Sequence, residues 1–304
     1  MSIFSSSRAI AFACILLICF PIHAQSRHAL LVGISNMPAG SGWANIHGAN
    51  DISLLMQVLP PDTRTAVLTD ANATYANIIH QLGAITERVR KGDIVYIHFS
   101  GHGQPFEDLN GDEEDGWDES FVPYDAKQYY EKGVYEGERH LVDDMLNRHL
   151  MRIRTRAGAE GMVYVVIDAC HSGGEYRNDE EEESADSVRD ENTHDIPEYE
   201  RGVNVGFSKD KVYVAPTDTR THYYVDSNSA MSPIVVLEAC MAGQKNCEIM
   251  HGGIYYGALS YSVAATLRYW QLSTNKSWVR EVEKTMREVL PRWSTQRMVV
   301  EESR

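Results

Sequence analysis

The sequence predicts an α/β fold in which a mainly parallel sheet is flanked by helices on both faces. Two stretches of strand length, Asp93–Phe99 and Met162–Ile167, are almost wholly apolar and rich in β-branched residues. Such continuous apolarity is typical of strands that are buried on both faces of a parallel sheet. Amphipathic stretches separate the predicted strands, and this β-α-β order implies right-handed crossovers.

The remaining elements follow from apolar spacing, since residues three and four apart share a helix face and β-branched runs favour strands. The first half predicts strands at His28–Ile34 and Thr65–Leu68 and helices at Ala49–Leu59, Tyr75–Val89 and Glu138–Ile153. The last third predicts strands at Val212–Ala215, Pro233–Leu237 and Arg297–Val300 and helices at Tyr256–Trp270 and Lys276–Leu290. With 304 residues, 43% of them hydrophobic, we expect one domain over residues 25–304.

The first 24 residues are predicted to be a signal peptide. Arg8 precedes an apolar run, Ala9–Phe20, that is too short to span a bilayer, and Ala24 fits a cleavage site. The alternatives are an uncleaved anchor or a lipidated cysteine, although Ile18 before Cys19 is bulky for a lipoprotein signal. We therefore expect an exported protein, periplasmic or secreted, with no stable membrane insertion after the signal is removed.

Charge and cysteine content narrow the function. The 43 acidic residues outnumber the 28 basic ones, which argues against nucleic acid and anionic membranes as partners and fits cationic substrates or calcium. After signal removal three cysteines remain, Cys170, Cys240 and Cys247, an odd number for an oxidising compartment. Either Cys240 pairs with Cys247 and leaves Cys170 as a thiol, or all three are reduced and buried.

A histidine and a cysteine follow the two most apolar strands. His102 lies in Ser100-Gly101-His102-Gly103, and Cys170 lies in Asp168-Ala169-Cys170-His171-Ser172-Gly173-Gly174. Open α/β sheets bind ligands at the carboxyl ends of their strands, where both residues are expected. An imidazole beside a thiol lowers the thiol pKa and can later protonate a leaving amine. We therefore predict a catalytic pair, with the backbone N–H groups of Gly103 and Cys170 as oxyanion donors.

Side chains two apart on a strand share a face, so Ser100 should point the same way as His102, and Asp168 the same way as Cys170. An unpaired carboxylate beside a thiol would raise the thiol pKa. Asp168 is therefore better explained as the floor of a pocket for a cationic substrate side chain, or as a residue that fixes the turn.

Two acidic regions stand out. Asp108, Asn110, Asp112 and Glu119 match positions of an EF-hand calcium loop, but Glu113 stands where that loop needs glycine, so a solvated loop or a composite calcium site is favoured. Asp143 and Asp144 near the start of a predicted helix could complement its dipole or hold a cation with this loop. Residues 175–211 are densely charged and aperiodic, which predicts an exposed linker within the domain.

The motifs YIHFSGHGQ and YVVIDACHSGG resemble those of the caspase-like cysteine peptidases, in particular the metacaspases including their bacterial members. The resemblance covers most of the chain from His28 onward. It implies a cysteine endopeptidase acting on proteins or peptides, with His102 and Cys170 as the dyad. It also implies that Asp51, Ser100 and Asp168 line a pocket that selects Arg or Lys before the cleaved bond.

The same resemblance implies that no cofactor is required for the dyad and that calcium can stimulate the enzyme, with Asp118, Asp143 and Asp144 at the matching positions. The family's further aspartate falls near Arg177 here, with Asp179 displaced. Such enzymes cut the linker during activation, and the candidate points in this chain are Arg177, Arg189 and Arg201. The alternatives are a clostripain-, gingipain- or legumain-like peptidase, or a catalytically silent calcium-binding homologue that acts as a regulator.

Overall fold

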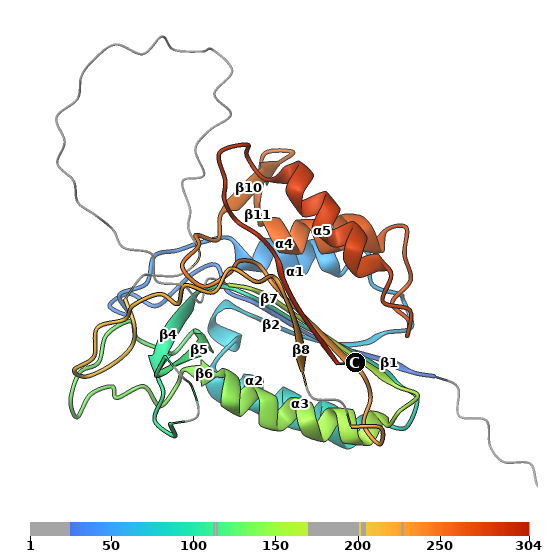
Figure 1. Cartoon of the computed structure of the whole chain (residues 1–304), viewed down its shortest axis with the longest axis horizontal. Helices are drawn as coiled ribbons and strands as arrows, with labels where there is room; N and C mark the ends of the chain where they lie inside the picture. Colours follow the sequence, from blue (N-terminus) through green and yellow to red (C-terminus); the bar gives the residue numbers. More distant parts are fainter. Residues whose placement is uncertain are drawn as a thin grey trace, which may run out of the picture.

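A seven-stranded sheet forms the centre of the molecule, which is known from a computed structural model that describes residues 25–111, 113, 115–169, 201, 205–225 and 228–303 (Figure 1). The strand order is β2-β1-β3-β7-β9-β12-β8. The strands are β1 Arg27–Gly33, β2 Arg64–Thr69, β3 Ile94–Ser100, β7 Met162–Asp168, β8 His222–Val225, β9 Ile234–Glu238 and β12 Val299–Ser303. The first five strands in this order are parallel, whereas β12 runs antiparallel to β9. The predicted fold class is therefore confirmed.

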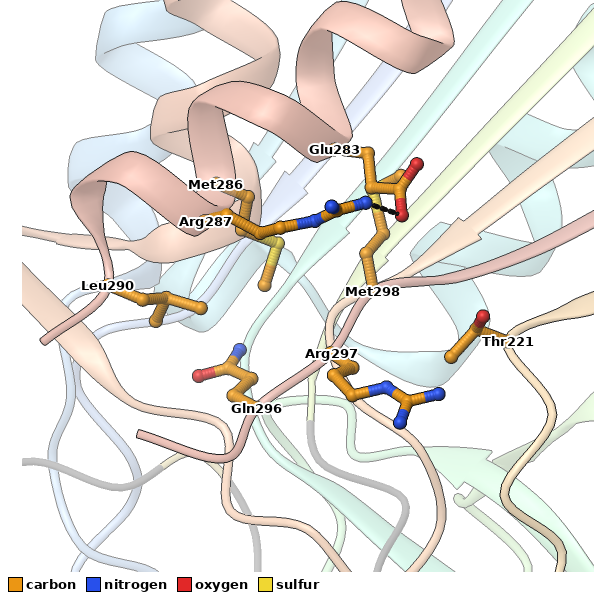
Figure 2. A pocket seen from close by; sticks show the side chains of 8 residues that line it. All are labelled: Thr221, Glu283, Met286, Arg287, Leu290, Gln296, Arg297 and Met298. Carbon is orange, nitrogen blue, oxygen red and sulfur yellow. Dashed lines mark hydrogen bonds and ion pairs between the residues drawn. The ribbon is translucent and has the colours of Figure 1, made fainter. Parts of the chain in front are cut away.

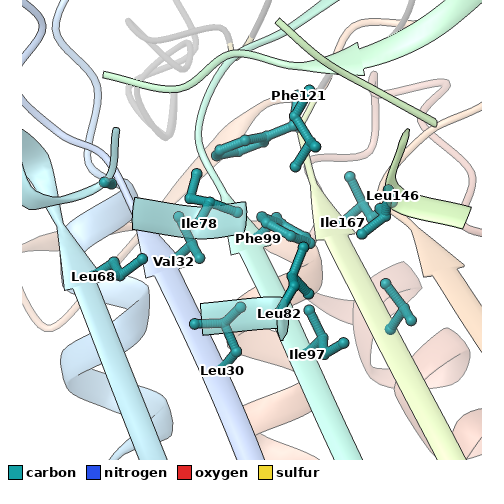
Figure 3. Packing of buried hydrophobic residues seen from close by; sticks show 14 of the residues in the cluster. Leu30, Val32, Leu68, Ile78, Leu82, Ile97, Phe99, Phe121, Leu146 and Ile167 are labelled. Carbon is teal, nitrogen blue, oxygen red and sulfur yellow. The ribbon is translucent and has the colours of Figure 1, made fainter. Parts of the chain in front are cut away.

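Helices cover both faces of this sheet (Figure 1). One layer holds α2 Tyr75–Arg88 and α3 Asp143–Ala157, and the other holds α1 Gly48–Leu55, α4 Ala258–Leu267 and α5 Trp278–Val289. Alternate strand residues supply two cores: Ile97 and Phe99 pack toward α2 and α3, and Tyr96 packs toward α4 and α5. Figure 3 shows the first core, with Phe99 beside Leu82 of α2. This alternation turns the even-numbered residues at the end of β3 toward α1 and α4.

Two small sheets flank the carboxyl end of the large sheet. The first contains β4 Gly103–Glu107, β5 Trp117–Phe121 and β6 Leu141–Val142, joined antiparallel in that order. The second is a hairpin of β10 Glu248–His251 and β11 Ile254–Gly257. Its turn uses Gly252 and Gly253, whose φ values of +62° and +80° favour glycine. A short 3₁₀ turn, η1, spans Asp70–Asn72.

Several element predictions were wrong in detail, among them the helix predicted at Tyr256–Trp270, which begins at Ala258 because Tyr256 and Gly257 belong to β11. Val212–Ala215 is not a strand, and Val212 and Val214 are 85% and 73% exposed, because this run passes over the surface beyond the sheet. The third helix begins at Asp143 rather than Glu138, since Leu141–Val142 pairs with β5 instead. Cys240 and Cys247 are both buried. Within the described ranges, no helix combines the length and apolarity that crossing a membrane requires.

Candidate active site

The two motif-bearing strands end side by side. β3 and β7 pair in parallel with Ser100 opposite Asp168, and the Gly101 N–H donates to the Asp168 carbonyl at 3.2 Å. His102 follows Ser100 by two residues, and Cys170 follows Asp168 by the same interval. Cys170 itself lies outside the described residues, as does the Gly173-Gly174 pair. The described strands thus bring the two predicted motifs to one edge of the sheet.

His102 is held in one orientation. Its Nε2 lies 2.8 Å from the Ala44 carbonyl, which can only accept, so Nε2 carries a proton and Nδ1 is the basic nitrogen. The ring stacks on Trp43 with centroids 4.9 Å apart, and only 3% of the residue is exposed. Burial lowers the His102 pKa to about 4, against the hydrogen bond to Ala44. The imidazole is therefore neutral at physiological pH, as a general base must be.

Gly103 presents its N–H away from β5. The Val122 N–H donates to the His102 carbonyl at 2.9 Å, so the opposed pair Gly103 and Phe121 is a non-hydrogen-bonded pair. The Gly103 N–H therefore faces the other edge of β4. Further along that edge, Phe207 pairs with β4, donating to the Pro105 carbonyl at 2.7 Å and accepting from the Glu107 N–H at 3.0 Å.

Beside these strand ends, four buried side chains form a closed acidic pocket, here called the basic-residue pocket. Ser100 and Asp168 come from β3 and β7, Asp51 from the first turn of α1, and Glu248 from β10. Each is no more than 1% exposed. The structure thus brings together the three predicted pocket residues and adds Glu248.

Arg201 of the linker fills this pocket and is itself 0% exposed. Its Nη1 lies 2.8 Å from Asp51 Oδ2 and donates to Ser100 Oγ at 2.6 Å, and Asp168 Oδ1 is 3.6 Å away. Its Nε donates to Glu248 Oε1 at 3.0 Å, and Nη2 lies 3.0 Å from the same oxygen. Burial acts to lower the Arg201 pKa, but the three carboxylates outweigh it and raise that pKa.

Backbone groups at Arg201 and a few residues beyond it are hydrogen-bonded to neighbouring elements. The Arg201 N–H donates to the Asn246 carbonyl at 3.0 Å. Four residues later, the Val205 carbonyl accepts from Gln104 Nε2 at 2.8 Å, and Phe207 then pairs with β4. Arg201 therefore lies in the pocket, and Val205 and Phe207 lie against β4, the latter on the edge on which Gly103 presents its N–H. Arg177 and Arg189 lie outside the described residues.

Neighbouring side chains and backbone groups hold the pocket carboxylates in place by hydrogen bonds. Asp168 accepts from Asn246 Nδ2 at 2.8 Å and from the backbone and hydroxyl of Ser260 at 2.7 and 2.6 Å. Burial acts to raise the Asp168 pKa, but Arg201 and these hydrogen bonds hold it below its usual value. For Asp51 the balance is reversed, and burial raises its pKa to about 7. One cation thus offsets part of the negative charge of a cluster that would otherwise be costly to bury.

Glycines bring the helices close enough to form this pocket. A Cβ on Gly48 would lie 2.4 Å from the Ser100 carbonyl oxygen, so only glycine lets α1 approach β3 and present Asp51. A Cβ on Gly257 would lie 2.1 Å from Asp168 Oδ2 and 2.5 Å from Arg201 Nη1. Gly257 also donates its N–H to Asp51 Oδ1 at 3.1 Å.

The predicted calcium residues lie at a different place, near a second group of carboxylates. A cavity of about 490 Å³, the acidic cavity, is lined by the carboxylates of Glu113, Glu119, Asp143, Asp144, Glu238 and Glu301. Burial raises the pKa of Glu119 to about 8 and that of Asp143 to about 7. Asp143 Oδ1 is buried without a hydrogen-bond partner, and the charge of Asp118 also raises the Asp143 pKa. In the described part of the chain, no three His, Cys, Asp or Glu side chains are grouped closely enough to hold a metal ion.

The EF-hand match has a local explanation. The carboxylate of Asp108 accepts backbone N–H groups from Asn110, Gly111 and Glu113, so it stabilises its own turn between β4 and β5. Asn110 donates to Asp144 Oδ2 at 2.5 Å. The flanking elements are strands rather than the two helices of an EF-hand.

A further hollow of about 400 Å³ lies beside α5 (Figure 2). Met286, Leu290 and Met298 form its apolar part, and an ion pair between Arg287 and Glu283 borders it. It shares no residue with the basic-residue pocket or with the acidic cavity.

Comparisons with known proteins agree with this arrangement. Residues 27–176 match the family model of the metacaspase peptidase C14 domain. Metacaspase-1B of Neosartorya fischeri is 27% identical over 213 residues, which is 65% of this chain and 48% of that protein. Metacaspase-1 of Eremothecium gossypii is 31% identical over 160 residues, 49% of this chain and 32% of that protein. The chain thus spans about half or less of the length of these relatives.

A solved structure supports the fold. Protein GSU0716 of Geobacter sulfurreducens superposes with a TM-score of 0.56 at 21% identity, covering 91% of this chain and 93% of that protein. The matched family model spans both motif-bearing strands, β3 and β7, and the carboxyl ends of those strands meet beside the basic-residue pocket. The chain therefore belongs to the metacaspases, a branch of the caspase-like proteins.

Proposed function

We propose that this protein is a cysteine endopeptidase that hydrolyses the peptide bond following a basic residue. The observation that carries the proposal is Arg201, whose side chain fills the basic-residue pocket while its own N–H is bound by the Asn246 carbonyl. A substrate arginine held in the same way would place its carbonyl carbon beside the ends of β3 and β7. Family membership supports the same chemistry.

In the proposed reaction, His102 Nδ1 takes the proton of the Cys170 thiol, and the thiolate attacks the substrate carbonyl carbon. The N–H groups of Gly103 and Cys170 stabilise the oxyanion, a role that the orientation of the Gly103 N–H supports. His102 then protonates the leaving amine. Water, deprotonated by His102, hydrolyses the thioester and restores the thiol.

We also propose self-cleavage in the linker, with Arg201 as the main point and Arg177 and Arg189 as further ones. Arg201 occupies the pocket, and Phe207 pairs with the edge of β4. Purified protein should yield a fragment that begins at Gly202, identified by intact mass and terminal sequencing. Cys170→Ala should abolish this fragment, whereas equal processing of Cys170→Ala and wild type would rule out self-cleavage. Arg201→Ala should remove this fragment while leaving any cut at Arg177 or Arg189.

Calcium is proposed as a stimulating ion bound near Asp118, Asp143 and Asp144. The supporting observation is Asp143 Oδ1, which is buried without a hydrogen-bond partner beside the carboxylates of the acidic cavity, oxygen donors of the kind that calcium takes. Calcium would have to draw these carboxylates together, because among the described residues no three are grouped closely enough to hold it. Bound calcium would supply positive charge that lets these carboxylates ionise together. Activity assays with calcium and with chelator, repeated on Asp143→Asn, test this assignment.

One assay separates the candidate functions. The purified protein is incubated with fluorogenic peptides that end in Arg, Lys, Asp or Asn, beside Cys170→Ala and the control Gly83→Ala, a substitution in α2 whose added Cβ meets nothing within 4 Å. Turnover after Arg or Lys that is lost only in Cys170→Ala supports the proposal. Turnover after Asn indicates a legumain-like enzyme, and calcium binding without turnover indicates a silent homologue.

Export is proposed from the first 24 residues alone. Expression of the full chain in a bacterial host, followed by fractionation and terminal sequencing, should give a mature protein that begins at Gln25. A full-length product in the cytoplasm would contradict this proposal.

A further inference from the structure

The basic-residue pocket contacts the Arg201 guanidinium at two separate points. At one point, Nη1 meets Asp51 Oδ2 at 2.8 Å and Ser100 Oγ at 2.6 Å. At the other, Glu248 Oε1 lies 3.0 Å from both Nε and Nη2. Guanidinium carries donors in a fixed planar fork, so one ligand can satisfy both points at once.

Lysine would satisfy only one of these points. Its ammonium is a compact charge at the end of a flexible stem and has no donor at the position of Nε. If the ammonium lies between Asp51 and Asp168, Glu248 receives no hydrogen bond from the substrate. The Glu248 side chain is 0% exposed with Arg201 in place, so a bound lysine would leave this buried carboxylate with its His47 hydrogen bonds alone and without a charged donor from the substrate, which is unfavourable.

We propose that Glu248 makes this enzyme select Arg over Lys and that His47 is the positioning residue that holds Glu248 in place. This proposal rests on the proposed function, because it assumes that substrates enter the pocket as Arg201 does. It assigns a specificity role to a residue of the β10–β11 hairpin, outside both strand-end motifs.

Contacts on the far side of Glu248 support this role. The His47 N–H donates to Glu248 Oε1 at 2.8 Å, and His47 Nδ1 lies 2.6 Å from Oε2. The His47 ring stacks on Tyr255 of β11, with centroids 5.0 Å apart. Both carboxylate oxygens are therefore held before a substrate arrives, which reduces the entropy lost on binding.

The hairpin also couples the two contact points. Glu248 of β10 is directly opposite Gly257 of β11. The Gly257 N–H donates to Asp51, the carboxylate at the other end of the guanidinium. The spacing between the two carboxylates is thus fixed by one rung of the hairpin, and it matches the width of a guanidinium.

The test compares kcat/KM for matched peptides that differ only in Arg or Lys before the cleaved bond. Wild type should prefer Arg at least tenfold. Glu248→Gln keeps the size and removes the charge, and should lower kcat/KM for Arg at least tenfold while changing that for Lys less than threefold. Asp51→Asn is the control, because it should lower both values together.

His47→Ala should raise KM for the Arg peptide with little change in kcat and leave the Lys peptide unchanged, since it acts only through Glu248. A general loss of structure would instead lower kcat/KM for the Arg and Lys peptides equally. Equal Arg and Lys values in wild type, or equal losses in Glu248→Gln, would overturn the proposal.

A binding measurement keeps the inference separate from catalysis. In Cys170→Ala/Arg201→Ala the dyad is broken and the pocket is vacated, so calorimetric titration with peptides ending in Arg or Lys reports the pocket alone. Tighter binding of the Arg peptide, lost on adding Glu248→Gln, supports the inference even if no turnover is seen. Equal binding of both peptides refutes the inference. If the variant binds the Arg peptide selectively but wild type shows no turnover of it, only the catalytic proposal is refuted.

Discussion

Gly257→Ala tests whether the basic-residue pocket is the substrate site. The Gly257 backbone has φ −64° and ψ 137°, which alanine adopts without strain, so the substitution acts through space alone. The added Cβ would lie 2.1 Å from Asp168 Oδ2 and 2.5 Å from Arg201 Nη1. The Cβ would overlap both Asp168 and the cation, so the two cannot both keep their positions and the ion pair is broken.

The expected magnitude follows from the charges involved. Removing one partner from a buried ion pair destabilises by about 3–5 kcal/mol. At about 1.4 kcal/mol per tenfold change, Gly257→Ala should lower kcat/KM for an Arg peptide by at least about 100-fold. The same change should prevent self-cleavage at Arg201, because that side chain can no longer enter the pocket.

The assay uses initial rates with the Arg peptide, alongside thermal unfolding to confirm that the variant is folded. Gly83→Ala is the matched control: Gly83 lies within α2, and an added Cβ meets nothing within 4 Å. Helix propensity predicts that this control gains about 0.5–1 kcal/mol of stability with unchanged activity. A folded Gly257→Ala variant whose kcat/KM is within threefold of wild type would refute the role assigned to the pocket.

Three further outcomes are expected. Ser100→Ala should lower kcat/KM for Arg peptides about tenfold, since it removes a neutral hydrogen-bonding group at 2.6 Å from the cation; an unchanged value would exclude a substrate contact. The raised pKa values of Glu119 and Asp143, about 8 and 7, mean that the folded state binds more protons than the unfolded state as pH rises from about 4.5 to 8. With chelator present, Tm should therefore fall as pH rises from about 5 to 8, and Glu119→Gln should reduce that fall; a Tm that rises over this range would contradict the assignment. Finally, because the His102 pKa is about 4, this general base becomes protonated only well below pH 6. A plot of kcat/KM against pH should therefore show no decrease near pH 6.5 that is due to His102.

Much of the site could be predicted because strand chemistry is local. Continuous apolar runs such as Ile94–Phe99 predict buried strands even when the adjacent strands of the sheet are unknown. The small residues that follow such a run indicate where the strand ends. Once β3 and β7 are parallel neighbours, Ser100 and Asp168 must lie at the same edge of the sheet. Asp51 was located by its resemblance to a family position rather than by any local pattern.

Glu248 could not be predicted, because its role depends on tertiary contacts. It lies 147 positions after Gly101 in the sequence, in a short strand whose other residues are unremarkable. The paired Gly252-Gly253 turn between short apolar runs was the available sign of a hairpin. Nothing in that sign indicates which side of the hairpin faces a pocket.

The small sheet was missed for a related reason. β4 to β6 are short and interrupted by the polar turn at Asp108, so their alternation is too brief to distinguish from a loop. The strand predicted at Val212–Ala215 was the opposite error, because β-branched residues form a strand only where the edge of another strand is available for pairing. Both errors concern pairing between distant segments.

The sheet order also limits what linker cleavage can accomplish. β7 precedes the linker and β9 follows it, yet the two are hydrogen-bonded neighbours from Val163 opposite Ile234 to Ile167 opposite Glu238. After a cut at Arg201, the two polypeptides would stay together, because each contributes strands to the same sheet. Size-exclusion chromatography would show one particle, whereas a denaturing gel would show two chains. The proposed cleavage would therefore change the connectivity of the backbone and leave the number of particles unchanged.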